Sequence, residues 1–376
     1  MVRRTLRPLA ALACVLACAL AGRAAPEGEK AQRAALWEKL APAFRPPAEL
    51  ASDFGTYRSP LRFDNGEPVR TPADWKRRRV EIRRYWTAQL GQWPKVLTRP
   101  RLEVLSQEPR EELTQQKVRV QVAPDRETEA YLLLPPGKGP FPAALVVFYE
   151  PETGIGQKGQ LRDFAYGLAK RGFVTLSLGL QWDTNYPTDP ERPLQPLSYL
   201  GYVGANGYHA LANLPQVDPR RIGVVGHSYG GKWAMFASCL YDRFAAAAWS
   251  DPGIVFDESR ANVNYWEPWY LGWEKDRFRK RGIPTAENPR TGPYAKLIAD
   301  GRDLHELHAL MAPRPFLVSG GSEDPVERWK ALNHTVAVNK LLGHENRVAM
   351  TNRPLHDPTP ESNEQLYRFF EYFLRR

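Results

Sequence analysis

The sequence RIGVVGHSYGGK at residues 221–232 decides the expected fold. Its first half is a short apolar run that ends at Gly226, which is typical of a buried strand. The apolar residues 233–240 that follow predict a helix. Ser228 lies between the two, with one glycine two residues before it and another two residues after it. This G-x-S-x-G pattern is typical of a serine held at a sharp strand-to-helix turn with its hydroxyl exposed. The pattern alone is common by chance, but the strand and helix contexts favour this interpretation over a buried structural serine.

Buried strands of the same kind recur on both sides of this turn. Continuous apolar runs, each separated from the next by a helical pattern, occupy residues 143–149, 172–178, 244–249 and 315–319. Such alternation predicts an α/β protein with a doubly wound, mostly parallel sheet of about eight strands flanked by helices. The strict alternation at 117–122 and the run at 130–134 predict antiparallel strands at one edge.

The first residues differ from the rest of the chain. Three arginines precede an apolar run at residues 9–20, which is too short to span a bilayer and is followed by small residues near Ala24. We therefore expect a signal peptide at residues 1–24 and a secreted or periplasmic protein, and no membrane span. A lipoprotein modified at Cys18 is the alternative, which Leu16 and the continuing apolar run disfavour.

Composition and charge limit the classes of partner. The chain has 376 residues, of which 43% are hydrophobic and 25% charged, as in globular proteins. Loss of the leader would lower the net charge from +10 to +6 by removing four arginines and would leave Cys239 as the single cysteine. No basic tract is concentrated enough to indicate nucleic-acid binding. We expect a monomer without internal disulfides.

The remaining chain divides into an N-terminal extension at residues 25–115 and a catalytic domain at 116–376. Thr71 and the following proline predict the start of a helix that ends at Gly91, with its basic residues on a solvated face. An insertion at about 254–300 carries six tyrosine and tryptophan side chains. They are equally compatible with a small satellite core and with carbohydrate stacking.

A serine hydroxyl needs a base to take its proton, and the base needs a carboxylate behind it. His356 follows the last expected strand, where the chain order serine, acid, histidine places the base. Asp324 follows the strand before it and is the first candidate for the acid; Asp251, one strand earlier, is the alternative, and Glu323 a lesser one. This chemistry requires no metal and no organic cofactor.

The oxyanion of the reaction needs two N–H donors beside the serine. The backbone N–H of Tyr229 is expected to supply one, and an N–H near Tyr149 and Glu150 the other.

Three stretches resemble a known family. They are similar to sequences of the glucuronoyl esterases and related acetyl xylan esterases. The stretches are residues 75–82 with 90–94, the strand-to-helix turn at 226–232 (the nucleophile elbow), and 303–315, which is the most specific. The resemblance covers most of residues 60–376 and implies an α/β-hydrolase fold. Glucuronoyl esterases cleave the ester between a lignin alcohol and 4-O-methyl-glucuronic acid on xylan.

The resemblance also implies roles for individual residues. Lys232 and Glu267 would contact the sugar, and Trp269 would pack on the uronate. Two positions depart from the family pattern, which has arginine where this chain has Tyr229 and cysteine where it has His227. These departures put the glucuronoyl specificity in question, while the hydrolase chemistry is unaffected.

The sequence therefore predicts a secreted serine hydrolase that cleaves carboxylic esters of plant or other polysaccharides through an acyl-enzyme. One alternative is a peptidase of the prolyl-oligopeptidase type, although the N-terminal sequence is too short for a propeller. Another is a carbohydrate-binding relative without catalysis.

Overall fold

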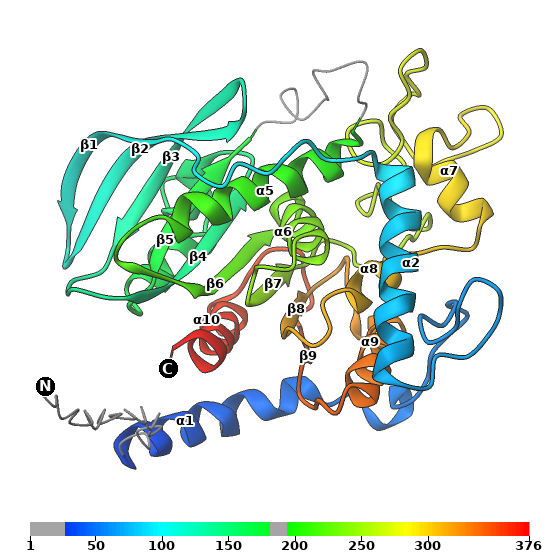
Figure 1. Ribbon diagram of the computed structural model, residues 1–376, viewed down its shortest axis with the longest axis horizontal. Helices are drawn as coiled ribbons and strands as arrows, with labels where there is room; N and C mark the ends of the chain where they lie inside the picture. Colours follow the sequence, from blue (N-terminus) through cyan, green and yellow to red (C-terminus); the bar gives the residue numbers. More distant parts are fainter. Residues whose placement is uncertain (1–26, 181–193, 376) are drawn as a thin grey trace, which may run out of the picture.

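The computed structural model describes residues 27–180 and 194–375, and a single large sheet runs through it (Figure 1). Nine strands pair in the order β1-β2-β3-β5-β4-β6-β7-β8-β9. They are β1 (Leu102–Arg110), β2 (Leu113–Ala123), β3 (Arg126–Leu134), β4 (Phe141–Phe148), β5 (Val174–Gly179), β6 (Val217–His227), β7 (Ala246–Ser250), β8 (Phe316–Gly320) and β9 (Val348–Asn352).

Strand direction divides the sheet into two parts. β1, β2 and β3 form an antiparallel meander, and β3 also pairs antiparallel with β5. From β5 onward, every pair is parallel. The expected α/β class and mostly parallel sheet are confirmed, with nine strands in place of about eight. The boundary expected between residues 115 and 116 lies inside β2, so the meander extends the sheet back to residue 102.

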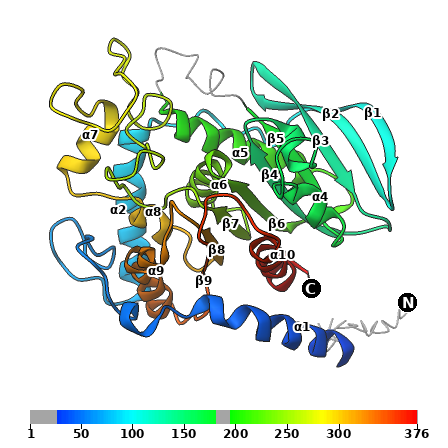
Figure 2. The same ribbon diagram turned by 180° about the vertical axis from the view of Figure 1, so that it is seen from behind.

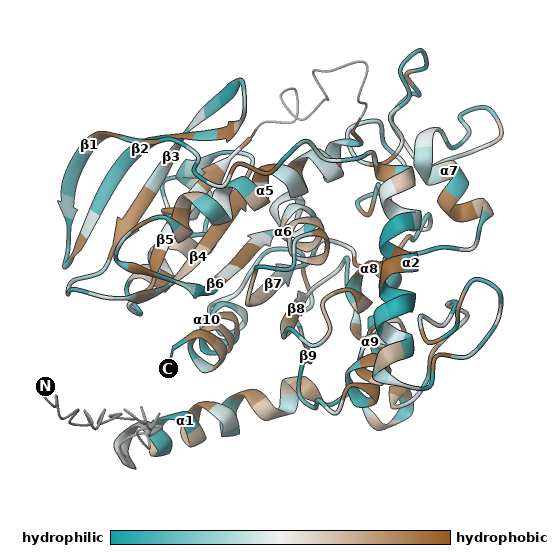
Figure 3. Ribbon diagram, viewed as in Figure 1, coloured by the Kyte–Doolittle hydropathy of each residue, from teal (hydrophilic) through white to brown (hydrophobic). Residues whose placement is uncertain are grey.

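Helices cover both faces of the parallel strands (Figures 1 and 2). The helices are α1 (Glu27–Leu40), α2 (Pro72–Leu90), α3 (Pro151–Gly154), α4 (Phe164–Ala169), α5 (Pro196–Ala212), α6 (Tyr229–Leu240), α7 (Gly292–Ala299), α8 (His305–Ala309), α9 (Trp329–Leu341) and α10 (Pro360–Leu374). Alternate residues of β4 enter two separate cores, because successive strand side chains point to opposite faces. Leu145 and Val147 pack with α5 and α6, and Val146 packs with α4 and α10. The central strands are accordingly hydrophobic in Figure 3.

Helix α2 begins and ends where the sequence predicts. Thr71 and Asp74 form a reciprocal capping box at its start, and Gly91 ends it with a φ of 88°. Its basic face is less solvated than expected: Arg78 is fully buried and pairs with Glu306 of α8. Arg78 can be buried because folding brings the carboxylate of Glu306 close to its guanidinium and stabilises the charge.

Two expectations about the membrane and the leader have different outcomes. None of the described helices is long and apolar enough to cross a bilayer. The signal peptide expected at residues 1–24, including Cys18, lies outside the described residues.

Candidate active site

Ser228 occupies a sharp turn between β6 and α6. Its φ of 57° and ψ of −114° are unusual for a residue with a side chain. A Cβ on Gly226 would lie 2.6 Å from the carbonyl oxygen of Val147, and a Cβ on Gly230 would press on the same atom. The two glycines of the motif are therefore required because the backbone of β4 passes too close for any side chain.

His356 joins the serine to a carboxylate. Its Nε2 lies 2.9 Å from Ser228 Oγ, and its Nδ1 lies 2.7 Å from Asp251 Oδ2. Asp251 is completely buried, whereas His356 is partly exposed. The three side chains thus form a continuous chain of hydrogen bonds from a buried acid to an accessible hydroxyl.

Asp324, the first candidate for the acid, makes other contacts. Its two carboxylate oxygens accept hydrogen bonds from the backbone N–H groups of Gly253 (2.8 Å) and Ile254 (2.6 Å). Burial, reinforced by the charge of Asp251, raises the pKa of Asp324 to about 7. Because His356 is bonded to Asp251, the geometry favours the alternative candidate. Glu323, the lesser candidate, accepts a hydrogen bond from Asn262 at 3.3 Å.

Arg353, which the sequence analysis did not select, anchors the histidine loop. Its buried guanidinium donates to the carbonyls of Ser319 (2.7 Å), His356 (2.5 Å) and Asp357 (2.8 Å). It therefore ties the loop that carries His356 to the end of β8. No sequence signal marks this role, since an arginine three residues before a histidine has no special meaning.

His227 packs beneath the histidine of the site. The two rings have centroids 4.6 Å apart, and His227 Nδ1 lies 3.1 Å from Ser250 Oγ. Desolvation holds the pKa of His227 well below its usual value, so the ring stays neutral. The sequence expectation of a packing role fits this position.

Tyr229, the residue after the serine, packs against Tyr149. The two rings are stacked at 3.9 Å and are nearly parallel, at 8°. Tyr149 follows β4 and is 46% exposed, while Tyr229 is buried and donates to the Leu180 carbonyl at 3.1 Å. Glu150 pairs with Lys158 at 2.8 Å. The segments expected to carry the two oxyanion donors are therefore adjacent, one at the N-terminus of α6 and the other at the end of β4.

The three residues expected to contact a sugar are buried. Lys232 is 3% exposed, and its ammonium donates to the Pro252 carbonyl. Glu267 is 2% exposed and pairs with Arg279 at 3.2 Å. Trp269 is 7% exposed, with the guanidinium of Arg281 5.8 Å from its ring. Sugar contact by these residues stays a prediction. The contacts of Glu267 and Trp269 lie within the insertion, and that of Lys232 joins α6 to the loop after β7.

The aromatic insertion is largely a core. Tyr265, Trp266 and Tyr294 are fully buried, and Tyr270 is 4% exposed. Phe256 packs edge-to-face on both Tyr265 and Tyr294. These four rings belong to the main hydrophobic core, so they form neither the separate satellite core nor an exposed sugar-stacking surface. Tyr149 is the exposed aromatic side chain that packs beside Tyr229.

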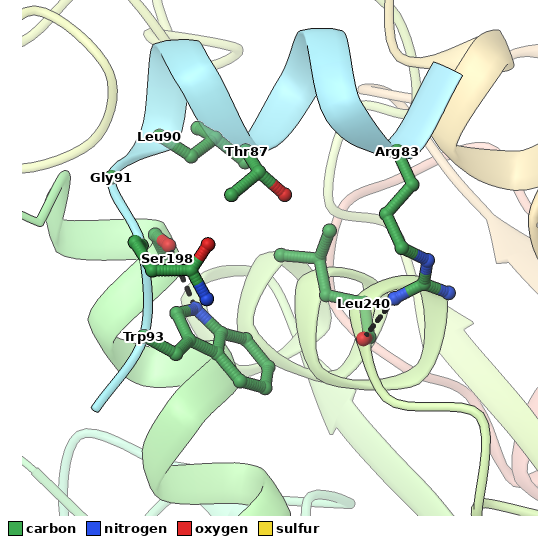
Figure 4. Close-up of a pocket in the computed structure, with 8 residues that line it drawn as sticks. Arg83, Thr87, Leu90, Gly91, Trp93, Ser198 and Leu240 are labelled. Atoms are coloured by element: carbon green, nitrogen blue, oxygen red, sulfur yellow. Dashed lines mark hydrogen bonds between the residues drawn. The ribbon is translucent and has the colours of Figure 1, made fainter. Parts of the chain in front are cut away.

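A separate cavity of about 240 Å³ lies between α2, α5 and α6 (Figure 4). Trp93 donates to Ser198 at 2.9 Å on one side of it, and Arg83 donates to the Leu240 carbonyl at 2.7 Å on the other. None of its lining residues belongs to the serine, histidine and aspartate arrangement. Among residues 27–180 and 194–375, no cluster of three or more side chains suited to a metal ion occurs.

Solved structures with a similar architecture include glucuronoyl esterases. The enzyme from Solibacter usitatus superposes with a TM-score of 0.66 at 19% identity, covering 85% of this chain and 97% of that chain. The one from Teredinibacter turnerae gives 0.61 at 18% identity, covering 91% and 98%. This chain has an α/β-hydrolase fold.

A third structure of this kind carries a ligand. It is a serine-to-alanine mutant of the Sporotrichum thermophile glucuronoyl esterase in complex with methyl 4-O-methyl-β-D-glucopyranuronate. It superposes with a TM-score of 0.57 at 19% identity, covering 85% of this chain and 87% of that chain. The model of the prolyl oligopeptidase family matches residues 205–325, which include Ser228 and both candidate acids. No curated protein matches the sequence significantly.

Proposed function

We propose that this α/β-hydrolase is a serine esterase that cleaves carboxylic esters of carbohydrates through an acyl-enzyme. The observation that carries the proposal is the hydrogen-bonded series Ser228 Oγ, His356 and Asp251, with separations of 2.9 Å and 2.7 Å. A base within hydrogen-bond reach of a hydroxyl, itself oriented by a carboxylate, is the arrangement that activates a serine.

The reaction proceeds in two steps. His356 Nε2 takes the proton of Ser228 as its Oγ attacks the ester carbonyl, and the imidazolium then gives that proton to the leaving alcohol. A water molecule, deprotonated by the same nitrogen, attacks the acyl carbonyl; the bond to Ser228 Oγ breaks, Oγ takes the proton back from the imidazolium, and the acid is released. Asp251 fixes the imidazole with its proton on Nδ1 and stabilises the imidazolium of each step.

The negative charge on the carbonyl oxygen requires donors that are already in place. We assign this role to the backbone N–H of Tyr229 and to one from residues 149–150. The first position is supported by the N-terminus of α6, where the helix dipole favours negative charge.

The carbohydrate part of the proposal is supported by the glucuronoyl esterase neighbours and by the exposed ring of Tyr149. An aromatic face held parallel to a second ring offers a flat apolar surface to a sugar. We further propose secretion through the leader at residues 1–24, which N-terminal sequencing of the exported protein would test.

Ser228→Ala tests the chemistry. We expect the variant to lose about 10⁴-fold or more in kcat on p-nitrophenyl acetate and on glucuronate methyl esters, and to lose labelling by a fluorophosphonate. The control is Ser259→Ala, an exposed serine of the insertion, which should keep wild-type rates. Undiminished hydrolysis by Ser228→Ala would refute the serine mechanism, and an unlabelled wild-type protein would favour a non-catalytic binding function.

A prolyl-oligopeptidase-like peptidase is the second candidate, because that family model matches residues 205–325. Both functions would use Ser228 as the nucleophile, so only the preferred substrate distinguishes them. A carbohydrate esterase hydrolyses acetylated xylan, feruloyl esters or glucuronate methyl esters faster than any prolyl peptide anilide, and the reverse order would favour the peptidase.

A further inference from the structure

The backbone that follows Asp251 is held by two buried side chains of opposite charge. The ammonium of Lys232, on α6, donates to the carbonyl of Pro252. The carboxylate of Asp324, after β8, accepts from the N–H groups of Gly253 and Ile254. Every hydrogen-bonding group named here is buried, so water does not compete for it.

The contact between the two aspartate loops is reciprocal. Asp251 accepts hydrogen bonds from the N–H groups of Gly321 (2.6 Å) and Asp324 (2.8 Å), while Asp324 accepts from the loop of Asp251. Each carboxylate thus binds the backbone that carries the other. Displacing either loop breaks bonds to both.

Asp251 needs such support because its backbone is strained. Its φ of 48° lies in the left-handed region, which residues with side chains adopt when the surrounding structure enforces it. A relaxation of residues 252–254 would rotate the carboxylate away from His356 Nδ1. Groups that bind Pro252, Gly253 and Ile254 therefore control the direction of the Asp251 side chain.

The cost of placing these charges indicates that the arrangement is specific. Desolvation lowers the pKa of Lys232 to about 8 and raises that of Asp324 to about 7. Lys232 also lies over the rings of Tyr265 (4.7 Å) and Tyr270 (5.5 Å), which favour a cation there. Two ionisable side chains are thus retained in a dry site at a cost, and both are bonded to the same three-residue segment.

We propose that Lys232 and Asp324 are positioning residues that hold residues 252–254 and thereby aim the carboxylate of Asp251 at His356. The proposal rests on the proposed role of Asp251 as the acid of the site. It assigns Asp324 a role other than that of the acid, and Lys232 a role other than sugar contact.

The test compares Asp324→Ala, Asp324→Asn and Lys232→Met with Asp251→Asn and Ser228→Ala, all on one soluble ester. Misplacement of the acid should lower kcat by about ten- to a hundredfold in Asp324→Ala and Lys232→Met, with KM within about twofold. Asp324→Asn keeps one acceptor for the two N–H groups and should recover part of that loss. The double variant Asp324→Ala/Lys232→Met should lose less kcat than the product of the two single fold-losses, because both residues act through one segment.

A matched control separates positioning from general stability. Asp303 is a partly buried aspartate that also accepts two backbone N–H bonds, from Phe256 and Leu304, where the insertion begins and ends. Asp303→Asn should lower the midpoint of urea unfolding as Asp324→Asn does, yet leave kcat within twofold of wild type.

The outcomes are distinguishable. A loss in Asp324→Asn as large as in Asp251→Asn would make Asp324 the acid and overturn the proposal. Unchanged kcat in Asp324→Ala and Lys232→Met, or a loss confined to KM, would overturn it as well. Full activity of Ser228→Ala would instead refute the serine esterase itself, whatever the other variants show.

Discussion

Arg353→Met should separate the anchoring of the histidine loop from the chemistry of the histidine. The guanidinium of Arg353 is 7% exposed and donates to carbonyls on both sides of a loop junction. Ser319 and Gly320 lie on one side, His356 and Asp357 on the other. Methionine has a similar length and no donor, so the substitution removes every one of these bonds without adding bulk.

The loss of stability in Arg353→Met depends on which carbonyl groups keep a hydrogen-bond donor. Ser319 O also accepts from Asp251 N, and Gly320 O also accepts from the Arg353 backbone, so both stay bonded in the variant. The carbonyls of His356 and Asp357 lose their guanidinium donor, at about 1–3 kcal/mol for each unsatisfied buried group. Because residue 357 is exposed and water can reach its carbonyl, we expect a loss of about 2–4 kcal/mol in the free energy of unfolding.

Urea unfolding and active-site titration with a fluorophosphonate measure the two effects. Arg353→Met should unfold at lower urea and should also lose about tenfold or more in kcat, since a displaced His356 no longer meets both of its partners. Arg314→Met is the matched control, because Arg314 has another partly buried guanidinium bound to carbonyls, at the other end of the strands. It should lose stability and keep its kcat. Wild-type unfolding of Arg353→Met, or the same fractional loss of kcat in both variants, would refute an anchoring role for Arg353.

Two further predictions concern binding and pH. Tyr149→Ala should raise KM for sugar esters about three- to tenfold with kcat within twofold, because a ring stacked on an aromatic face contributes about 0.5–1.5 kcal/mol. Tyr149→Phe keeps the ring and should keep the wild-type KM. Equal KM values in the two variants would exclude this aromatic face from substrate binding. Stability should fall on acidification from about pH 6.5 towards 3, since burial keeps His308 and His305 neutral in the folded protein and lowers the pKa of His305 to about 3. Above pH 6.5 neither state protonates these rings, so the difference appears only below it, at about 1.4 kcal/mol per pH unit for each histidine. Urea unfolding at a series of pH values should show that the free energy of unfolding falls less steeply on acidification in His308→Gln than in wild type. Parallel falls in the two proteins would contradict a neutral, buried His308.

Local signals and chain order were sufficient to predict much of the fold and two residues of the candidate site. The elbow at Ser228 could be predicted because the turn itself leaves no room for side chains at its glycine positions. Helix α2 could be predicted because Thr71 and Gly91 satisfy its ends without help from distant residues. The position of His356 followed from chain order, since the last strand of a parallel sheet precedes the final helix.

What the sequence left open depends on contacts made only by folding. The burial of Arg78 requires Glu306, more than two hundred residues away in the chain. The role of Arg353 requires carbonyls on a neighbouring loop, and any residue type supplies a carbonyl. Strand β1 escaped detection because its sequence LEVLSQEPR is largely exposed at the sheet edge and shows no apolar run.

The two candidate acids show why sequence order alone stops short of the answer. β7 and β8 are adjacent and parallel, so Asp251 and Asp324 both follow strand ends on the same edge of the sheet. A buried site cannot easily hold two ionised carboxylates with the same partners, because each raises the cost of the other's charge. The fold separates them by donors: Asp251 receives the imidazole and the amides of the β8 loop, while Asp324 receives two amides of the β7 loop. Which aspartate meets the histidine is therefore decided by the direction of the backbone after β7, where the left-handed turn at Asp251 points its carboxylate towards His356.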